Sequence, residues 1–296
     1  MKEFEFIKSL KKISPPLPYG IGDDAAVSGD LLITHDLMAE GVHFTEEEDL
    51  NTVIDRLFIS NISDIAAMGG INGGYKALLG VAIPEWVDKK KLAEAICSAA
   101  GKYNVSLIGG DTSFSGKGLF LALTVTGICN KYILRRSGAK PGDNVYISRA
   151  TGGAQYELYR RLGILNGCQA IKTEIAPECE LGETLGYTEG ITACTDISDG
   201  LGGDLSHIAE ASGARIIIEK NALPLPDIPL PDDKLYEYAL SSGEEFALLF
   251  TASPETEIKY NKPLYKIGKV CAGTGCFIEE RDGSLKDISQ MGYEHR

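Results

Sequence analysis

The sequence predicts a mixed α/β protein organised as two domains. Patterns typical of helices and of strands alternate in both halves of the chain, as expected of an α/β (α+β) fold. The length of 296 residues exceeds the usual size of a single domain. A basic segment containing glycine and proline, residues 135–142, separates the halves, so we expect domains at 1–137 and 138–296.

The first half begins with a helical pattern, because Phe4, Ile7 and Leu10 fall on one face before Pro15. Further along, Thr52 is a suitable N-cap for a long helix that stops at two glycines. The later predicted elements of this half are a strand at 31–37, a helix at 52–68, a strand at 75–83, a helix at 88–103, a short buried strand at 105–108 and a strand at 119–128.

The second half alternates in the same way and contains a proline-rich loop at 224–231. Gly213 closes a helix that is expected after residue 199, and Asp199 can serve as the N-cap of this helix. The predicted elements are strands at 144–148, 191–196, 214–219, 245–251, 265–270 and 276–280, and helices at 153–162 and 200–211.

The composition is that of an acidic protein with ordinary hydrophobic cores. A formal net charge of -13 argues against non-specific nucleic-acid binding and against an anionic membrane surface. No apolar run approaches the ~20 residues of a membrane span, and residues 1–6 carry acids where a signal peptide needs an apolar core. The seven cysteines form no CxxC pair, which indicates reduced thiols and a cytoplasmic protein.

Aspartates gather at the ends of apolar runs, most of them beside glycine or another small residue. They are Asp23, Asp24, Asp36, Asp64, Asp111, Asp196 and Asp199. If these carboxylates converge, each unpaired contact at ~5 Å costs roughly 3 kcal/mol at an effective dielectric of ~20, so cations must hold them together. Oxygen ligands suit Mg²⁺, which commonly acts on phosphates. Each aspartate taken alone can instead be a turn former or a helix cap.

Three of these aspartates have an informative local context. Asp64 shares a helical face with Ser60 and Asn61 among apolar neighbours, so this polar stripe is expected to line a cleft. Asp111 follows two glycines, which would let backbone N–H groups approach a ligand. Asp196 ends a buried strand, and the next helix presents its N-terminus to phosphate oxygens. A solvated helix face and a tight turn remain the structural alternatives.

Two familiar nucleotide-binding motifs are absent. Gly116-Lys117 lacks both the first glycine and the final Ser or Thr of a Walker A loop. Residues 20–25 match a loose dinucleotide fingerprint, but prolines at 15–18 stand where a strand is required. A phosphate ligand would therefore depend on cations or on local backbone donors.

Other polar residues stand near these motifs without a decisive pattern. His43 follows a predicted strand, and one carboxylate of the pair Glu244 and Glu245 is expected to point into a cleft. Arg135 and Arg136 can neutralise phosphates or simply belong to the linker. On spacing alone, a site role and a surface role stay equally open for each.

Taken together, these segments resemble the thiamine-monophosphate kinase family. The superfamily also holds aminoimidazole ribonucleotide synthetase, selenophosphate synthetase and a hydrogenase-maturation protein. The motifs stand in order along nearly the whole chain. They are Gly22-Asp23-Asp24-Ala25, Thr34-His35-Asp36, Gly41-Val42-His43-Phe44, Asn61-Ile62-Ser63-Asp64, Gly109-Gly110-Asp111-Thr112, Arg136-Ser137-Gly138-Ala139, Asp196-Ile197-Ser198-Asp199-Gly200 and Ser242-Gly243-Glu244-Glu245.

The resemblance implies ATP- and Mg²⁺-dependent phosphorylation of thiamine monophosphate to thiamine diphosphate. It implies a homodimer in which the N-terminal domain completes a barrel with its partner, and a C-terminal α/β sandwich domain. The implied Mg²⁺ ligands are Asp24, Thr34, Asp36, Asp64, Asp111, Asp196 and Asp199, of which Asp111, Asp196 and Asp199 would be catalytic. Gly110, Asp111, Arg136 and Ser198 would bind ATP, and His43, Glu244 and Tyr293 would bind the acceptor.

The implied chemistry agrees with the aspartate pattern. A phosphate acceptor is already largely an anion at neutral pH, because its second pKa is near ~6, so no general base is needed. Two positions depart from the family pattern: His35, where a metal contact is in doubt, and Ser242, which could alter the pocket.

Two other classes of function stay open. One is another ATP-dependent enzyme of the superfamily, although selenophosphate synthesis would want a cysteine near the N-terminus and hydrogenase maturation one at the C-terminus. The first cysteine here is Cys97, and the last residues are Glu294-His295-Arg296. The other is a non-catalytic nucleotide-binding regulator, against which the number of acidic ligands argues.

Overall fold

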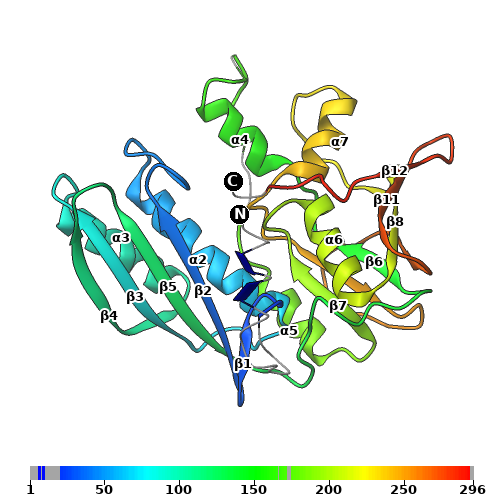
Figure 1. The fold of residues 1–296 in the computed structure, drawn as a ribbon, viewed down its shortest axis with the longest axis horizontal. Coiled ribbons are helices and arrows are strands. Elements are labelled where there is room, and N and C mark those ends of the chain that lie inside the picture. Colours follow the sequence, from blue (N-terminus) through cyan, green and yellow to red (C-terminus); the bar gives the residue numbers. More distant parts are fainter. Residues whose placement is uncertain (1–5, 8, 11–20, 166, 172–174, 294–296) are drawn as a thin grey trace.

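The computed structural model describes residues 6–7, 9–10, 21–165, 167–171 and 175–293. Residues 6, 7, 9 and 10 are helical, as the periodicity predicted. Phe4 and the prolines at 15–18, which also entered the predictions, lie outside the described residues. Figure 1 shows two sheets, one from each half of the chain, with the long helix α2 (Leu50–Ala67) between them.

The first sheet has the strand order β1-β2-β5-β3-β4. Its strands are β1 (Ala26–Ser28), β2 (Leu31–Ala39), β3 (Tyr75–Pro84), β4 (Val105–Ser115) and β5 (Phe120–Ile128). All neighbours are antiparallel except β3 and β4. A parallel pair needs a crossover, and α3 (Lys89–Lys102) supplies it.

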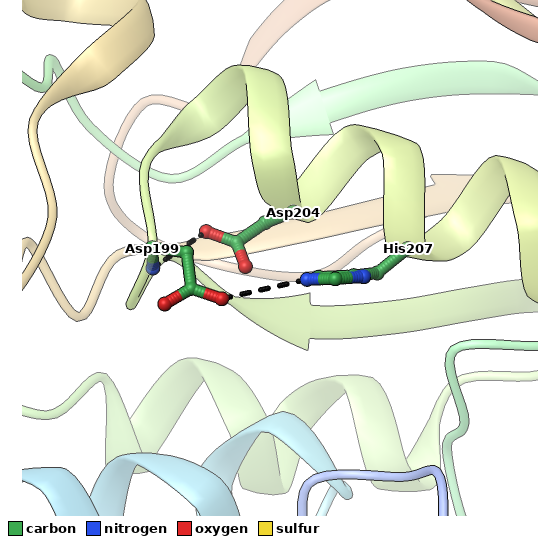
Figure 2. Close-up of side chains that lie close together, drawn as sticks. All are labelled: Asp199, Asp204 and His207. Atoms are coloured by element: carbon green, nitrogen blue, oxygen red, sulfur yellow. Dashed lines mark hydrogen bonds and ion pairs between the residues drawn. The ribbon is translucent and has the colours of Figure 1, made fainter. Parts of the chain in front are cut away.

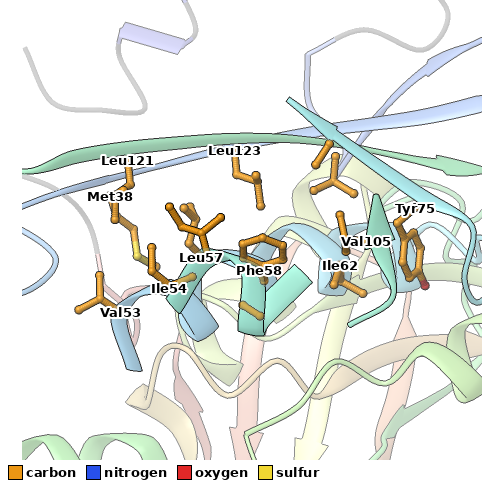
Figure 3. Packing of buried hydrophobic residues seen from close by; sticks show 14 of the residues in the cluster. Met38, Val53, Ile54, Leu57, Phe58, Ile62, Tyr75, Val105, Leu121 and Leu123 are labelled. Carbon is orange, nitrogen blue, oxygen red and sulfur yellow. The ribbon is translucent and has the colours of Figure 1, made fainter. Parts of the chain in front are cut away.

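The face of this sheet that packs on α2 and α3 forms the first core. Alternate side chains of a strand point to opposite faces, so β5 buries Leu121, Leu123 and Val125 completely. Figure 3 shows Leu57 and Phe58 of α2 beneath these strands. α2 begins at Asp49, whose carboxylate accepts a hydrogen bond from the Thr52 backbone N–H at 3.1 Å. The prediction of Thr52 as the N-cap was therefore wrong.

The opposite face of the first sheet also exposes large apolar side chains, with His35 and Lys76 among them. Exposed side chains on this face include Leu31, Leu37, Leu78, Phe120 and Ile128. Contiguous apolar surface of this kind marks an interaction site more often than chance exposure.

The strand β4 differs from its prediction as a short buried strand at 105–108. It runs from Val105 to Ser115 at the edge of the sheet, and Val105 is its only buried residue. The apolar run Val105 to Ile108 suggested burial, but an edge strand has one neighbour and here pairs along all of β3. A Cβ at Gly110, whose φ is 153°, would clash with the Leu79 backbone, so only glycine fits this close approach.

The second sheet has seven strands in the order β12-β11-β8-β10-β6-β9-β7. Its elements are β6 (Asn144–Ile147), β7 (Ile191–Asp196), β8 (Arg215–Glu219), β9 (Leu248–Ala252), β10 (Tyr265–Cys271), β11 (Gly275–Glu279) and β12 (Leu285–Asp287), with helices α4 (Gly153–Arg161), α5 (Cys179–Tyr187), α6 (Leu201–Ser212) and α7 (Asp232–Ser241) and the 3-10 turn η1 (Lys220–Ala222). A second core lies between α6 and this sheet. The helices α5 and α7 had no sequence prediction.

The strand β9 begins at Leu248 and not at Glu245 as predicted. Glu244 and Phe246 both have positive φ values, 54° and 52°, which end the extended conformation. The intervening Glu245 is buried and turned toward α4, where its Oε1 accepts backbone N–H groups of Gly152 at 2.7 Å and Ala154 at 3.0 Å. Capping of α4 therefore decides the local backbone.

The two halves meet through a third apolar cluster at the end of α2. Its buried members are Ala67, Leu134, Leu181, Leu185, Cys194, Leu248 and Phe250. The helix α5 packs so closely on α2 that a Cβ at Gly182 would overlap the Ala66 backbone. Among the described residues, no helix is both long and apolar enough to cross a membrane. All seven cysteines fall within the described residues and are free thiols.

Candidate acidic active site

Three predicted metal ligands from distant parts of the sequence meet where the two halves join. Asp24 precedes β1, Asp64 lies on α2 and Asp196 ends β7. Each offers a carboxylate oxygen, and the three oxygens lie within 4.8 Å of one another. Asp36 of β2 is close enough to act on the charges of Asp64 and Asp196. The aspartate pattern therefore predicted a real convergence for these four side chains, which we call the interdomain cluster.

Hydroxyl groups hold the cluster on one side. Thr34 donates from Oγ1 to Asp64 Oδ2, and Ser63 donates to Asp196 Oδ2 at 2.5 Å. Thr195 donates to Asp24 Oδ1 at 2.9 Å. Thr34 is buried on the face of β2 that meets α2, which explains why a polar residue interrupts that strand.

The other side of the cluster consists of oxygens without partners. Asp24 Oδ2, Asp36 Oδ2 and Asp196 Oδ1 are buried and accept no hydrogen bond from any described residue. Asn61 Oδ1 on α2 is also unpartnered, while its amide donates to the Leu57 carbonyl at 2.8 Å. Buried carboxylate oxygens without donors are costly, so this arrangement fits one or more bound cations.

The electrostatics of the cluster point the same way. Loss of hydration raises the pKa of Asp64 well above its usual range, and the charges of Asp36, Asp196 and Asp24 raise it further. Loss of hydration, followed by the charge of Asp24, raises the pKa of Asp196 to about 7. Without a cation, the cluster therefore keeps protons that ordinary aspartates release.

Arg136 provides the positive charge seen at the cluster. Its Nη2 and Nε donate to Asp24 Oδ1 at 2.6 and 3.1 Å, and its backbone N–H donates to Asp23 Oδ1 at 3.1 Å. Arg136 was predicted to bind ATP, and the structure places it beside the cluster with Asp24 as its partner. Asp24 is thus shared between a guanidinium group and the proposed cation position.

The loop from Asp196 to Gly200 is held by a residue that the sequence analysis missed. Asp204 Oδ2 accepts the backbone N–H groups of Ser198, Asp199 and Gly200 at 3.1, 3.2 and 3.1 Å. Gly200 is the N-cap of α6, so the prediction of Asp199 as the cap was wrong. An acidic residue in the first turn was a usable signal, because such residues favour helix N-termini.

The loop places Asp199, another predicted metal ligand, in a group separate from the interdomain cluster. Asp199 lies next to His207, with its Oδ2 at 3.4 Å from His207 Nε2, as Figure 2 shows. Tyr293 is exposed, and its backbone N–H donates to the Asp199 carbonyl at 2.9 Å. Tyr293, predicted to bind the acceptor, is therefore beside this loop.

His43 and Glu244, the other two predicted acceptor residues, are joined by an arginine that the sequence analysis missed. Arg56 Nη2 donates to Glu244 Oε1 at 2.7 Å and to the His43 carbonyl at 3.0 Å. His43 Nδ1 accepts the Ala39 backbone N–H at 3.0 Å, which fixes the orientation of the ring. Of the Glu244 and Glu245 pair, Glu244 is the partly exposed side chain. Arg56 gave no sequence signal beyond its place on the polar side of α2.

Gly110 and Asp111 lie elsewhere. They are exposed on the edge strand β4, where Asp111 pairs with Gly80 of β3. Three strand positions separate β4 from β2, a distance of roughly 14 Å at ordinary strand spacing. The described residues of one chain therefore do not bring Asp111 to the interdomain cluster, and its assignment to the metal site stays a prediction.

A cavity of about 550 Å³ lies away from the acidic residues, between residues 131–137 and 188–192. Its lining contains Lys131 and Arg135 and, among the described residues, no carboxylate. Size alone does not make it the site, because the convergent groups with perturbed pKa values lie elsewhere.

Comparison with known proteins identifies the family. Residues 22–129 match the N-terminal domain of AIR synthase related proteins, and residues 140–279 match the C-terminal domain. The chain is 35% identical over 321 residues to the thiamine-monophosphate kinase of Caulobacter vibrioides, with 99% of this chain and 90% of the relative covered. The chain belongs to the AIR synthase related proteins and, within them, to the thiamine-monophosphate kinase family of enzymes. This confirms the resemblance seen in the sequence.

Two solved structures show the same fold. AaThiL complexed with AMPPCP and TMP is 28% identical, with a TM-score of 0.83 and coverage of 100% of this chain and 97% of that one. A chain in a crystal structure of a HypE-HypF complex is 20% identical, with a TM-score of 0.79 and coverage of 95% of this chain and 98% of that one. The second likeness concerns the fold alone.

Proposed function

We propose that this protein transfers the γ-phosphoryl group of ATP to thiamine monophosphate, giving thiamine diphosphate and ADP. The interdomain cluster is the observation that carries the proposal, because buried carboxylates with unpartnered oxygens suit Mg²⁺ beside phosphates. Relatives named thiamine-monophosphate kinase, and a neighbour complexed with the ATP analogue AMPPCP and with TMP, support the choice of substrates.

The side chains that would hold Mg²⁺ are the carboxylates of the interdomain cluster. Asp24, Asp36, Asp64 and Asp196 would bind directly, all but Asp64 through a buried oxygen without a partner, and Thr34 would orient Asp64. Bound Mg²⁺ would neutralise and align the two phosphate groups for in-line transfer. Asp111 and Asp199 stay in the proposal as metal ligands that lie outside the interdomain cluster. Asp111, Asp196 and Asp199 stay in the proposal as catalytic residues.

The protein's own groups divide between the two substrates. Arg136 beside the cluster and Ser198 on the α6 loop would contact ATP phosphates. The backbone at Gly110 would contact them from the opposite subunit, because Gly110 lies on β4 away from the interdomain cluster of its own subunit. The Arg56-bridged pair, His43 and Glu244, would bind the acceptor, and the Glu244 carboxylate suits a cationic thiazolium ring.

No general base is required in this scheme. The acceptor phosphate is already an anion at neutral pH. What the protein must provide is alignment and charge neutralisation, and free thiamine, whose hydroxyl is neutral, would gain less from such a site.

A homodimer is the second part of the proposal. The outward face of the first sheet is apolar and exposed at Leu31, Leu37 and Phe120, and β4 is an unprotected edge. A second copy packed on this face would complete a barrel across the dimer. A dimer would also explain the position of Asp111. We place Asp111 in the active site of the opposite subunit, because the interdomain cluster of its own subunit is about 14 Å away.

The dimer can be tested by sedimentation. Leu37→Glu should shift the protein to a monomer at micromolar concentration, whereas Glu210→Gln, an exposed change on α6, should not. A wild-type monomer at that concentration would contradict this part of the proposal. Nucleic acid and membranes are not among the proposed partners, and cytoplasmic localisation stays a prediction.

The shared site gives a sharper test through mixed dimers. Asp111→Asn and Asp196→Asn homodimers should each be inactive, and co-expression should restore about a quarter of wild-type activity if the two residues serve different subunits' sites. Absence of any restored activity, with mixed dimers shown to form, would return Asp111 to its own subunit.

Turnover of ATP with thiamine monophosphate tests the function itself. We expect thiamine diphosphate as the product and much slower turnover of free thiamine. Equal or faster turnover of free thiamine would contradict the acceptor assignment. ATP consumption without thiamine diphosphate would favour another enzyme of the superfamily, and binding without turnover would favour a regulator.

A further inference from the structure

Asp199, Asp204 and His207 form a second group of possible metal ligands, which we call the α6 cluster. Each offers one ligand atom, and these atoms lie within 4.8 Å of one another. Asp204 and His207 stand three residues apart on α6 and so share a face of the helix. The preceding loop folds back and brings Asp199 to them, as Figure 2 shows.

An unpartnered oxygen at the bottom of the α6 cluster points to a ligand. Asp204 is completely buried, and its Oδ2 is occupied by three backbone N–H groups. Its Oδ1 is buried and has no hydrogen-bond partner among the described residues. Figure 2 shows the second Asp204 oxygen directed toward the space between the Asp199 carboxylate and the His207 ring. A buried acceptor left unsatisfied costs about 1–3 kcal/mol, which a bound ion would offset.

Charge decides what kind of ligand fits. The N-terminus of α6 contributes about half a positive charge, and Arg136 adds a positive charge that acts on Asp204. Against these, loss of hydration and the charges of Asp199, Asp196 and Asp24 raise the pKa of Asp204 well above its usual range, so a bound cation would relieve the excess of negative charge. The Asp199 and His207 side chains are 36% and 22% exposed, so solvent reaches two of the three ligand residues.

We propose that the α6 cluster binds a divalent transition-metal ion, such as Zn²⁺ or Cu²⁺, through two carboxylates and the imidazole of His207. The imidazole distinguishes it from the interdomain cluster, whose donors are all oxygens, because nitrogen ligands favour transition metals while oxygen ligands suit Mg²⁺. Asp199 thereby belongs to a different ion from Asp24, Asp64 and Asp196. Metal binding can be measured without turnover, so the proposal does not depend on the kinase assignment.

Pulsed EPR of the full chain with one equivalent of Cu²⁺, and calorimetric titration with Zn²⁺, test the proposal on protein without an affinity tag, both in excess Mg²⁺ to fill the all-oxygen interdomain cluster. Wild-type protein should show coupling of Cu²⁺ to an imidazole nitrogen. His207→Gln should lose that coupling and bind Zn²⁺ about tenfold or more weakly, since even outer-shell changes cost that much. Glu210→Gln is the matched control on the same helix and should behave as wild type.

Two further results separate the clusters. Asp64→Asn should keep the nitrogen coupling, and His43→Gln should keep it as well, because neither residue is in the α6 cluster. If wild-type protein shows neither nitrogen coupling nor a heat of Zn²⁺ binding, the proposal is overturned. That result would indicate a protonated Asp204 carboxyl instead. Unchanged coupling in His207→Gln would overturn it equally. If His207→Gln fails to fold, wild-type protein labelled with ¹⁵N-histidine is measured instead. A nitrogen coupling that changes with the label supports a histidine ligand, and a coupling that does not change overturns the proposal.

Discussion

The interdomain cluster and the α6 cluster are both acidic, but they are assembled in different ways. The interdomain cluster takes Asp24, Asp36 and Asp64 from one half of the chain and Asp196 from the other. The α6 cluster comes from residues 199–207 alone and is fastened by backbone N–H groups. The first therefore depends on how two domains are packed, while the second depends on one helix terminus. Changes in domain packing should affect the first cluster and leave the second intact.

The largest expected effect is loss of turnover when the interdomain cluster loses a charge. Asp64→Asn or Asp196→Asn should lower kcat at least about a hundredfold, because each removes a preorganised charge at the transferring phosphate. The metal-free protein should be equally or more stable, since repulsion is relieved. Steady-state kinetics and thermal unfolding measure both. Near wild-type turnover at saturating Mg²⁺ would remove that residue from the site.

The next effect tests the dependence on domain packing. Gly182→Ala places a Cβ inside the Ala66 backbone, so α5 must move away from α2. We expect this movement to increase the separation between Asp64 on α2 and Asp196 at the end of β7. We expect a loss of roughly 1–3 kcal/mol in unfolding free energy and a drop in turnover. Gly101→Ala on α3 is the matched control, because its Cβ would meet open space and should add about 0.5–1 kcal/mol. Zn²⁺ binding at the α6 cluster should persist in both variants.

The pH dependence of stability follows from the raised pKa of Asp196. The folded protein holds this proton up to about pH 7, whereas the unfolded chain releases it near the usual aspartate value of 3.8. The folded state therefore binds more protons between these values, and metal-free stability should fall as pH rises through this window. One carboxyl contributes a slope of at most about 1.4 kcal/mol per pH unit.

Asp64, whose pKa is raised too, contributes in the same direction. Denaturant unfolding in EDTA from pH 5 to 8 measures the slope, and Asp196→Asn should flatten it. A slope of the same size in Asp196→Asn would show that another group carries it.

The smallest effect concerns the acceptor. Glu244→Ala, His43→Ala and Arg56→Ala should each raise the KM for thiamine monophosphate roughly tenfold and leave the KM for ATP nearly unchanged. Arg56→Ala belongs in this set because it removes the bridge between the other two residues. Parallel loss of ATP affinity would move these residues to the nucleotide side.

Most residues of the interdomain cluster could be predicted from the sequence, for a physical reason. Asp36, Asp64 and Asp196 each follow or interrupt an apolar run, so the same pattern that predicts a core element also predicts a buried carboxylate. Asp24 instead follows a glycine-containing segment, Gly20-Ile21-Gly22-Asp23. Thr34 was found by resemblance only, and its bond to Asp64 depends on α2 lying over β2.

What the sequence did not show depends on contacts between distant segments. Arg56 and Glu244 are 188 positions apart in the sequence, and no local pattern predicts a contact between them. The strand β4 looked buried because its composition is apolar, but its position at an edge is a property of the whole sheet. Asp204 could have been predicted as an acidic residue in the first turn of α6. It was not predicted because Asp199 already occupied the position where an N-cap was expected.

The close packing of α5 on α2 has a practical consequence for dissecting the molecule. By sequence α5 belongs to the second half, yet Cys179 at its start packs into the first core, and Gly186 lies against Gly69 after α2. A fragment cut after residue 137 would leave the end of α2 without its cover. Recombinant versions of the first half should therefore carry α5, for example through a short engineered connection, if they are to remain in solution.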